Sequence, residues 1–65
     1  MAYITRLADL VPGLTFQCIY QREGRRYTFT VIKSYVRNNQ EKVEVLYGGS
    51  HHTINFDDLQ EITPC

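Results

Sequence analysis

The sequence has no tryptophan, only two cysteines and no net charge at neutral pH. Zero net charge argues against a simple electrostatic grip on nucleic acid or on an anionic membrane. No apolar stretch approaches the roughly 20 residues that a membrane-spanning helix needs. The first residues, 1–6, lack the charged start and apolar run of a signal peptide. We therefore expect a cytoplasmic domain without a membrane anchor.

The two cysteines lie far apart in the chain. Cys18 is inside a strand-like run and Cys65 is the last residue. Small secreted domains that depend on disulfides normally carry more cysteines at closer spacing. We predict a buried, reduced Cys18 and an exposed Cys65, and a link between two copies through Cys65 stays open.

What the chain does contain is enough apolar sequence for one small core. It has 65 residues, of which 43% are hydrophobic, a fraction typical of globular domains. A chain of this size buries only about 60% of the surface that its unfolded form exposes, so its stability margin is narrow. We expect a single domain over residues 1–65, in which residues 1–12 are a lead-in.

The charges are distributed unevenly along the chain. Residues 1–37 carry six basic and two acidic side chains, whereas residues 38–65 carry one basic and five acidic side chains. In a barrel, early and late strands often pair, so we expect folding to interleave the two signs.

The lead-in has apolar residues at three- and four-residue spacing, which predicts one or two helical turns before Pro12-Gly13. An extended lead-in is the alternative. After Pro12-Gly13 the period becomes two: residues 15–21 read as a strand, residues 22–25 as a polar hairpin loop, and residues 26–37 as a long strand. Its apolar residues change face around Val31-Ile32, which predicts a bend from one half of a barrel to the other.

The second half of the chain continues the pattern. Asn38-Asn39 predicts a turn, residues 41–47 alternate with Val43, Val45 and Tyr47 facing inward, and Gly48-Gly49-Ser50 predicts a tight turn. Residues 51–55 read as a short strand, residues 56–59 as one helical turn and residues 60–62 as a last strand. Five short strands at close spacing predict an all-β, closed or nearly closed small barrel.

Residues 12–62 resemble the SH3-like small barrels, and among them the Tudor-type and KOW-type modules. The matching features are the Pro-Gly start, the bent strand Tyr27–Tyr35, a strand that ends in Leu46-Tyr47-Gly48-Gly49, and the turn Phe56-Asp57-Asp58-Leu59. Tudor-type domains bind methylated side chains through aromatic residues, and KOW-type domains contact RNA or protein. The resemblance thus implies a five-stranded SH3-like barrel with a binding role. Tyr20, Tyr27, Tyr35 and Tyr47 lie either in the core or at the rim of such a barrel, and at the rim they are candidate contacts for a partner.

Three arginines, Arg22, Arg25 and Arg26, cluster on the first hairpin beside Tyr20 and Tyr27. Arginine next to aromatic rings suits phosphate contact and base stacking, and it equally suits a carboxylate-bearing protein surface. A solvated hairpin tip is the structural alternative. This hairpin is the strongest candidate for a binding surface in the sequence.

The pair His51-His52 follows Gly48-Gly49-Ser50. Adjacent strand residues point to opposite faces, so we expect no metal site there. A contact between Ser50, His51 or His52 and a small anionic ligand is a secondary hypothesis. The adjacent acids Asp57-Asp58 suit the start of a helical turn better than a catalytic pair.

Together these patterns predict a binding module and no enzyme, with no cofactor and no metal. The leading hypothesis is docking onto a protein partner as an adaptor or inhibitor. The first alternative is nucleic-acid binding through the arginine hairpin, and the second is a homo-oligomer that holds a small anionic ligand, such as a nucleotide, where subunits meet.

Overall fold

The computed structural model describes residues 2–65, which form an all-β fold with five antiparallel strands and two short 3-10 turns. The strands are β1 (Thr15–Tyr20), β2 (Arg25–Arg37), β3 (Gln40–Tyr47), β4 (Ser50–Asn55) and β5 (Leu59–Pro64). The turns are η1 (Leu7–Asp9), ahead of β1, and η2 (Phe56–Asp58), directly before β5. The predicted all-β class, the number of strands and the helical turn before the last strand are confirmed.

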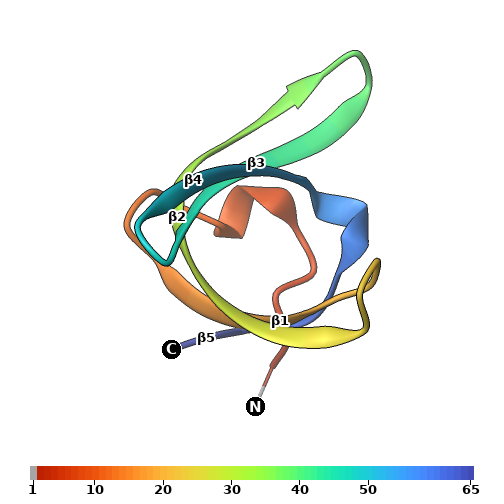
Figure 1. Ribbon diagram of the computed structural model, residues 1–65. Helices are drawn as coiled ribbons and strands as arrows, with labels where there is room; N and C mark the ends of the chain where they lie inside the picture. Colours follow the sequence, from red (N-terminus) through yellow and green to blue (C-terminus); the bar gives the residue numbers. More distant parts are fainter. Residues whose placement is uncertain (1) are drawn as a thin grey trace.

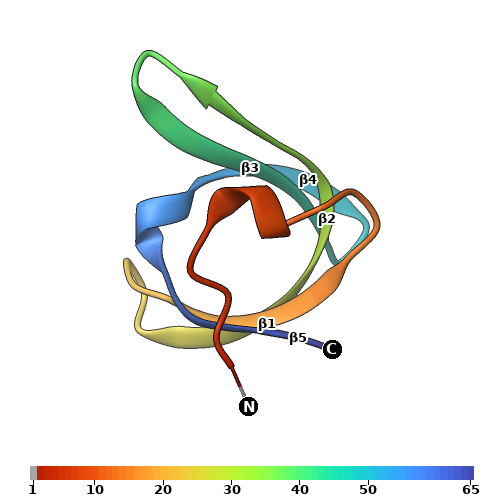
Figure 2. The ribbon, with the colours of Figure 1, turned by 180° about the vertical axis from the view of Figure 1, so that it is seen from behind.

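The strands form one sheet in the order β4-β3-β2-β1-β5, so successive strands are neighbours until β5 returns to pair with β1. Figure 1 shows the sheet curled about the core, with β1 and β5 on one side and β3 and β4 on the other. The view from behind shows η1 lying within the ring that the strands outline (Figure 2). This curvature is consistent with a small barrel-like fold.

The core combines alternate residues of the strands with two leucines of the lead-in. Its buried members are Leu7, Leu10, Phe16, Cys18, Phe29, Val31, Val43, Val45, Ile54, Leu59 and Ile62. Between residues 2 and 12 the lead-in contains only the single turn η1, and Tyr3 and Val11 are exposed, so the predicted apolar helical face is wrong at both of its ends. The first residues of the lead-in are extended instead, because the Ile4 amide donates a hydrogen bond to the Ile62 carbonyl of β5 at 2.7 Å.

The predicted bend in the long strand is present in β2. Its register against β3 shifts between Val31 and Lys33, which makes Ile32 the extra residue of a bulge. Beyond the bulge the inward position passes to Ser34, which lies opposite the buried Val43. The end of the β2–β3 hairpin projects from the body (Figure 1), and Val36 there is 63% exposed.

Two hairpins turn through pairs of residues with positive φ, as the sequence predicts. Asn38 and Asn39 have φ of 53° and 64°, and Gly48 and Gly49 have φ of 59° and 79°. Positive φ at both central residues defines the type I′ turn, whose twist matches that of the flanking strands. The register of β4 against β3 is therefore fixed from the Gly48-Gly49 turn onward.

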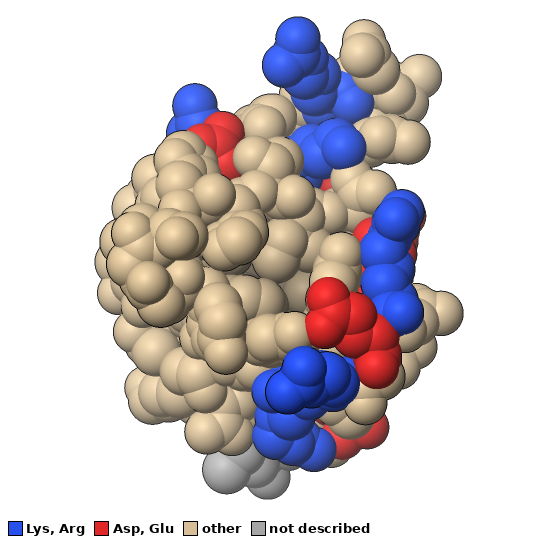
Figure 3. Space-filling model, in the orientation of Figure 1, with Lys and Arg blue, Asp and Glu red and all other residues tan. Residues whose placement is uncertain are grey.

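Basic side chains of the first half of the chain pair with acidic side chains of the second half, as expected. Arg22 pairs with Asp58 at 2.9 Å, and Lys33 pairs with Glu44 at 3.6 Å. Figure 3 shows basic and acidic side chains next to one another along one side, beside a broad uncharged face. Cys18 is buried and Cys65 is exposed, and the two are not bonded to each other. Within residues 2–65 no helix is long and apolar enough to cross a bilayer.

Candidate functional site

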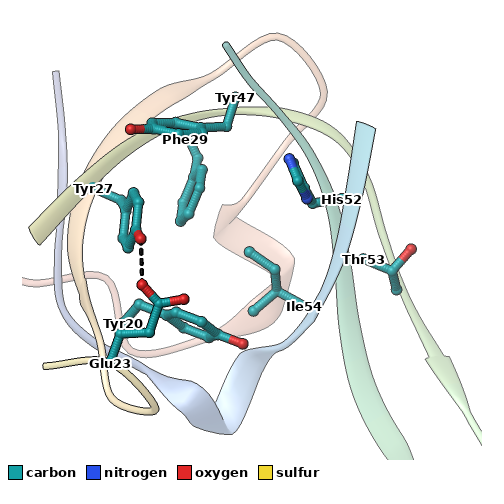
Figure 4. Close-up of a pocket in the computed structure, with 8 residues that line it drawn as sticks. All are labelled: Tyr20, Glu23, Tyr27, Phe29, Tyr47, His52, Thr53 and Ile54. Atoms are coloured by element: carbon teal, nitrogen blue, oxygen red, sulfur yellow. Dashed lines mark hydrogen bonds between the residues drawn. The ribbon is translucent and has the colours of Figure 1, made fainter. Parts of the chain in front are cut away.

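A pocket of about 320 Å³ opens between the first hairpin and the β3–β4 hairpin. It is lined by Tyr20, Glu23, Tyr27, Phe29, Tyr47, His52, Thr53 and Ile54 (Figure 4). The volume lies at the lower end of the range for ligand-binding pockets, about 300–1,000 Å³. It can hold a side chain or a small molecule.

The back of the pocket is a stack of rings on β2. Tyr27 and Phe29 are two positions apart, so both point to the same face of the strand. Their rings are nearly parallel, at an interplanar angle of 12° and a centroid distance of 5.3 Å. The ring of Tyr20, on β1, meets Tyr27 edge to face at 6.2 Å. Alternation along β2 therefore places Tyr27 beside Phe29, and the pairing of β1 with β2 adds Tyr20.

Tyr47 completes the aromatic wall from the end of β3. Its ring centroid lies 5.1 Å from that of Tyr27 and 5.6 Å from that of Phe29, both at steep angles. Edge-to-face pairs of this kind are favourable beyond the area that they bury. Figure 4 shows Tyr47 at one end of the pocket and Tyr20 at the other. Although Tyr47 is 45% exposed, these contacts hold its ring in place.

The side of the pocket opposite Tyr27 is formed by β4. His52 and Ile54 point into the pocket, whereas the Thr53 side chain points away (Figure 4). The His52 ring lies 6.5 Å from that of Tyr47. Because Thr53 lines the pocket without its side chain, its main chain forms this part of the rim.

The one carboxylate among the eight lining residues belongs to Glu23. Its turn is closed by hydrogen bonds from the Glu23 and Gly24 amides to the Tyr20 carbonyl, at 3.1 and 2.8 Å. The Tyr27 hydroxyl donates to Glu23 Oε1 (Figure 4), and this hydrogen bond is the main cause that raises the pKa of Tyr27. The site thus combines aromatic walls with one negative charge.

The structure brings together part of the predicted binding set. Tyr20, Tyr27 and Tyr47 all line the pocket. The Arg25 guanidinium lies 6.0 Å from the Tyr27 ring centroid, next to the pocket but not among its lining residues. The other two arginines lie outside the pocket: Arg22 is paired with Asp58 of η2, and Arg26 takes the alternate strand position to Arg25. The three arginines therefore do not form one patch.

The remaining predicted residues lie apart from the pocket or divide between the two faces of the sheet. His51 and His52 occupy opposite faces, as alternation predicts, and Ser50 is exposed at the start of β4. Nε2 of His51 lies 2.6 Å from Glu44 Oε1. Tyr35 belongs to this second cluster, because it hydrogen-bonds Glu44 and packs under Lys33, whose Nζ is 5.4 Å from the ring centroid.

Glu44 is the centre of that cluster, which the sequence did not suggest. Burial acts to raise the pKa of its carboxyl, but hydrogen bonds from His51 and Tyr35 and the charge of Lys33 outweigh it, so the pKa is lowered. The side chain of Glu44 is 14% exposed. This arrangement ties β2, β3 and β4 together on the face away from the pocket.

Four lining residues were missed by sequence reasoning: Glu23, Phe29, Thr53 and Ile54. Phe29 could have been found, because it shares a strand face with Tyr27. Glu23 lies in a loop that the sequence marks only as polar, and its position depends on how the turn closes. Thr53 takes part through its main chain, which no side-chain pattern reveals.

The adjacent acids Asp57 and Asp58 lie in η2, where Asp58 accepts the Arg22 hydrogen bond. Among residues 2–65 no three His, Cys, Asp or Glu side chains are grouped so that they could hold a metal ion. In comparisons with known proteins, the chain matches no family model, no curated protein and no solved structure.

Proposed function

We propose that the chain is an SH3-like small barrel that works as a non-catalytic docking module for a protein partner, of the adaptor or inhibitor type. The observation that carries the proposal is the surface pocket walled by four aromatic rings and one carboxylate. Tyrosine-rich concave surfaces are typical of protein-binding sites. The curled five-stranded sheet supports the resemblance to the SH3-like barrels.

The chemistry of the pocket favours a cationic group as its occupant. Aromatic faces carry negative potential, and a cation within about 6 Å of a ring centroid is attracted by roughly 0.5–2 kcal/mol, depending on desolvation. Glu23 adds a full negative charge at the same place. The partner would therefore present a basic side chain, such as lysine, arginine or a methylated form of either.

The same features argue against an anion in this pocket. A phosphate would approach the Glu23 carboxylate, and Arg22 is already hydrogen-bonded to Asp58. Nucleic-acid binding through Arg25 and Arg26, and a nucleotide held between subunits near His51 and His52, remain alternative hypotheses with the opposite charge requirement.

A non-catalytic role is supported by the lining residues themselves. Thr53 is the only serine or threonine among them, and its side chain points away from the pocket. Glu23 is hydrogen-bonded to a tyrosine rather than to a nucleophile with a base beside it. The described pocket lining therefore offers no activated nucleophile of the kind that covalent catalysis needs.

A pair of charge-removing variants tests the sign of the pocket. With choline as the probe, Glu23→Gln should weaken binding about two- to fivefold, as expected for an exposed ion pair. Arg25→Gln should leave binding unchanged or strengthen it, because a like charge next to the pocket is removed. Binding is measured by NMR titration of the backbone amides, and Glu41→Gln on β3 is the control.

Two results would contradict a cation-binding pocket. If Arg25→Gln weakens the binding of every ligand that the chain takes, and Glu23→Gln strengthens it, the pocket is an anion site and the alternatives move forward. If choline shifts the same amides as sodium chloride at equal ionic strength, the pocket holds no organic cation.

A further inference from the structure

The pocket lies against a sheet edge beside which residues 2–65 place no further strand. β4 is the last strand in the sheet order, paired only with β3. Among residues 2–65, the backbone hydrogen bonds outside the strand ladders involve no residue of β4. An unpaired edge of this kind presents a row of free amides and carbonyls to another chain.

The turn at Gly48-Gly49 determines which groups point outward. Tyr47 and Ser50 flank this two-residue turn, and the turn hydrogen bond makes them a hydrogen-bonded pair. Hydrogen-bonded and non-hydrogen-bonded pairs alternate along an antiparallel ladder. Counting from Ser50, the amides and carbonyls directed away from β3 belong to His51, Thr53 and Asn55.

The outward groups and the pocket meet at one residue. Thr53 lines the pocket through its main chain, since its side chain points away from it (Figure 4). Its neighbours His52 and Ile54 place their side chains in the pocket. A strand added along this edge would therefore have every second side chain on the pocket side of the sheet.

We infer that the partner is an extended segment that pairs with the free edge of β4 and inserts one basic side chain into the aromatic pocket. Main-chain hydrogen bonds to Thr53 supply affinity without regard to sequence, and the pocket supplies selectivity, as in strand addition generally. The Glu23 carboxylate provides the charge complement for the inserted side chain. This inference rests on the proposed docking function and specifies the form of its partner.

The experiment uses two probes on the whole chain. One is choline, which tests the pocket alone, and the other is a short capped peptide, Ser-Thr-Val-Lys-Val-Thr-Ser, whose control has glutamine in place of lysine. The variant Thr53→Pro removes the outward amide, a change that edge strands tolerate because that amide faces solvent. Thr53→Ala is the matched control, since it removes the side chain but keeps the amide.

We expect the lysine peptide to bind the native chain and Thr53→Ala alike, and to bind Thr53→Pro about two- to tenfold more weakly, the loss of one main-chain hydrogen bond. Because the Thr53 main chain also lines the pocket, choline reports any change in the pocket itself, and Thr53→Pro should weaken peptide binding more than it weakens choline binding. The inference is overturned if the peptide binds Thr53→Pro as tightly as the native chain. If choline itself fails to bind the native chain, the failure belongs to the proposed function instead.

A second measurement does not depend on the folding of the proline variant. Amide hydrogen exchange of the native chain is followed with and without the lysine peptide. Protection of the Thr53 amide, and of the His51 and Asn55 amides beside it, supports strand addition. Unchanged exchange at Thr53 under saturating peptide rejects it, whatever the affinity.

Discussion

Glu23 is the residue that gives the pocket its sign. Its carboxylate lies among rings that would otherwise make a neutral apolar hollow, and the Tyr27 hydroxyl holds it in place. Arg25, two residues further along the same hairpin, carries the opposite charge, and its guanidinium lies 6.0 Å from the Tyr27 ring centroid. Residues of both signs on one short hairpin explain why net charge along the sequence says little about this site.

The two cysteines should differ sharply in reactivity. Burial raises the pKa of the Cys18 thiol to about 11, against the lowering effect of the Arg26 charge. The thiolate is the reactive form, so Cys18 should be inert near neutral pH. We expect a disulfide reagent such as Ellman's to modify one thiol per native chain, Cys65, and both thiols in concentrated guanidinium chloride.

Cys65→Ser provides the control for that experiment. It should leave no rapidly reacting thiol in the native chain. Rapid modification of Cys18 in this variant would show that the core opens far more readily than its packing implies.

Among the elements, the β2–β3–β4 unit is held by Glu44 on its outer face. The pKa of Glu44 is lowered in the folded chain, so its contribution to stability is full above the ordinary glutamate pKa of about 4.3 and is lost as pH falls through the lowered value. Glu44→Gln should therefore lower the melting temperature at neutral pH. The difference from the native chain should shrink as pH falls below about 4.

The matched variant is Glu41→Gln, on the same strand and exposed near the hairpin end. It should change the melting temperature little at any pH. Equal effects of Glu41→Gln and Glu44→Gln across the pH series would mean that the cluster of His51, Lys33 and Tyr35 adds no specific stabilisation.

The elements were largely predictable from sequence, and the reasons are local. The alternation around Phe16 and Cys18, the double asparagine and double glycine turns, and the change of face at Ile32 each depend on neighbouring residues alone. The lead-in was less predictable, because the hydrogen bond between Ile4 and Ile62 joins residues far apart in the chain and replaces helix with extended structure.

The site was only partly predictable for the same reason. Tyr20, Tyr27 and Tyr47 could be proposed from their residue type, but whether Arg22 and Arg26 join them depends on η2 and on strand alternation. Residue type alone does not separate Tyr35 from the pocket tyrosines, because the bulge at Ile32 is what directs the later part of β2 toward Glu44.

The whole molecule depends on its lead-in to complete the core. Leu10 is fully buried although it lies outside every strand. Leu10→Ala should cost about 2–5 kcal/mol, a large share of the stability of so small a domain. Chemical denaturation measures the loss. Val11→Ala, at a neighbouring position that is 51% exposed, should stay within about 0.5 kcal/mol of the native chain.

If Leu10→Ala proved as stable as the native chain, the lead-in would be an appendage and the strands alone would form the domain. A loss close to that of a core strand residue such as Val45→Ala would place the lead-in within the same cooperative unit.

The most direct test of the central claim compares two ligands of one shape in the native chain. Choline carries a quaternary ammonium, and its uncharged isostere has carbon in place of the nitrogen. Amide NMR titration should show choline shifting the signals of Tyr27, Tyr47 and His52, with the isostere binding several-fold more weakly because it lacks the charge that the rings and Glu23 attract. Equal binding of the two would make the pocket merely apolar, and binding of neither would contradict the proposal that it is a docking site for a cationic group.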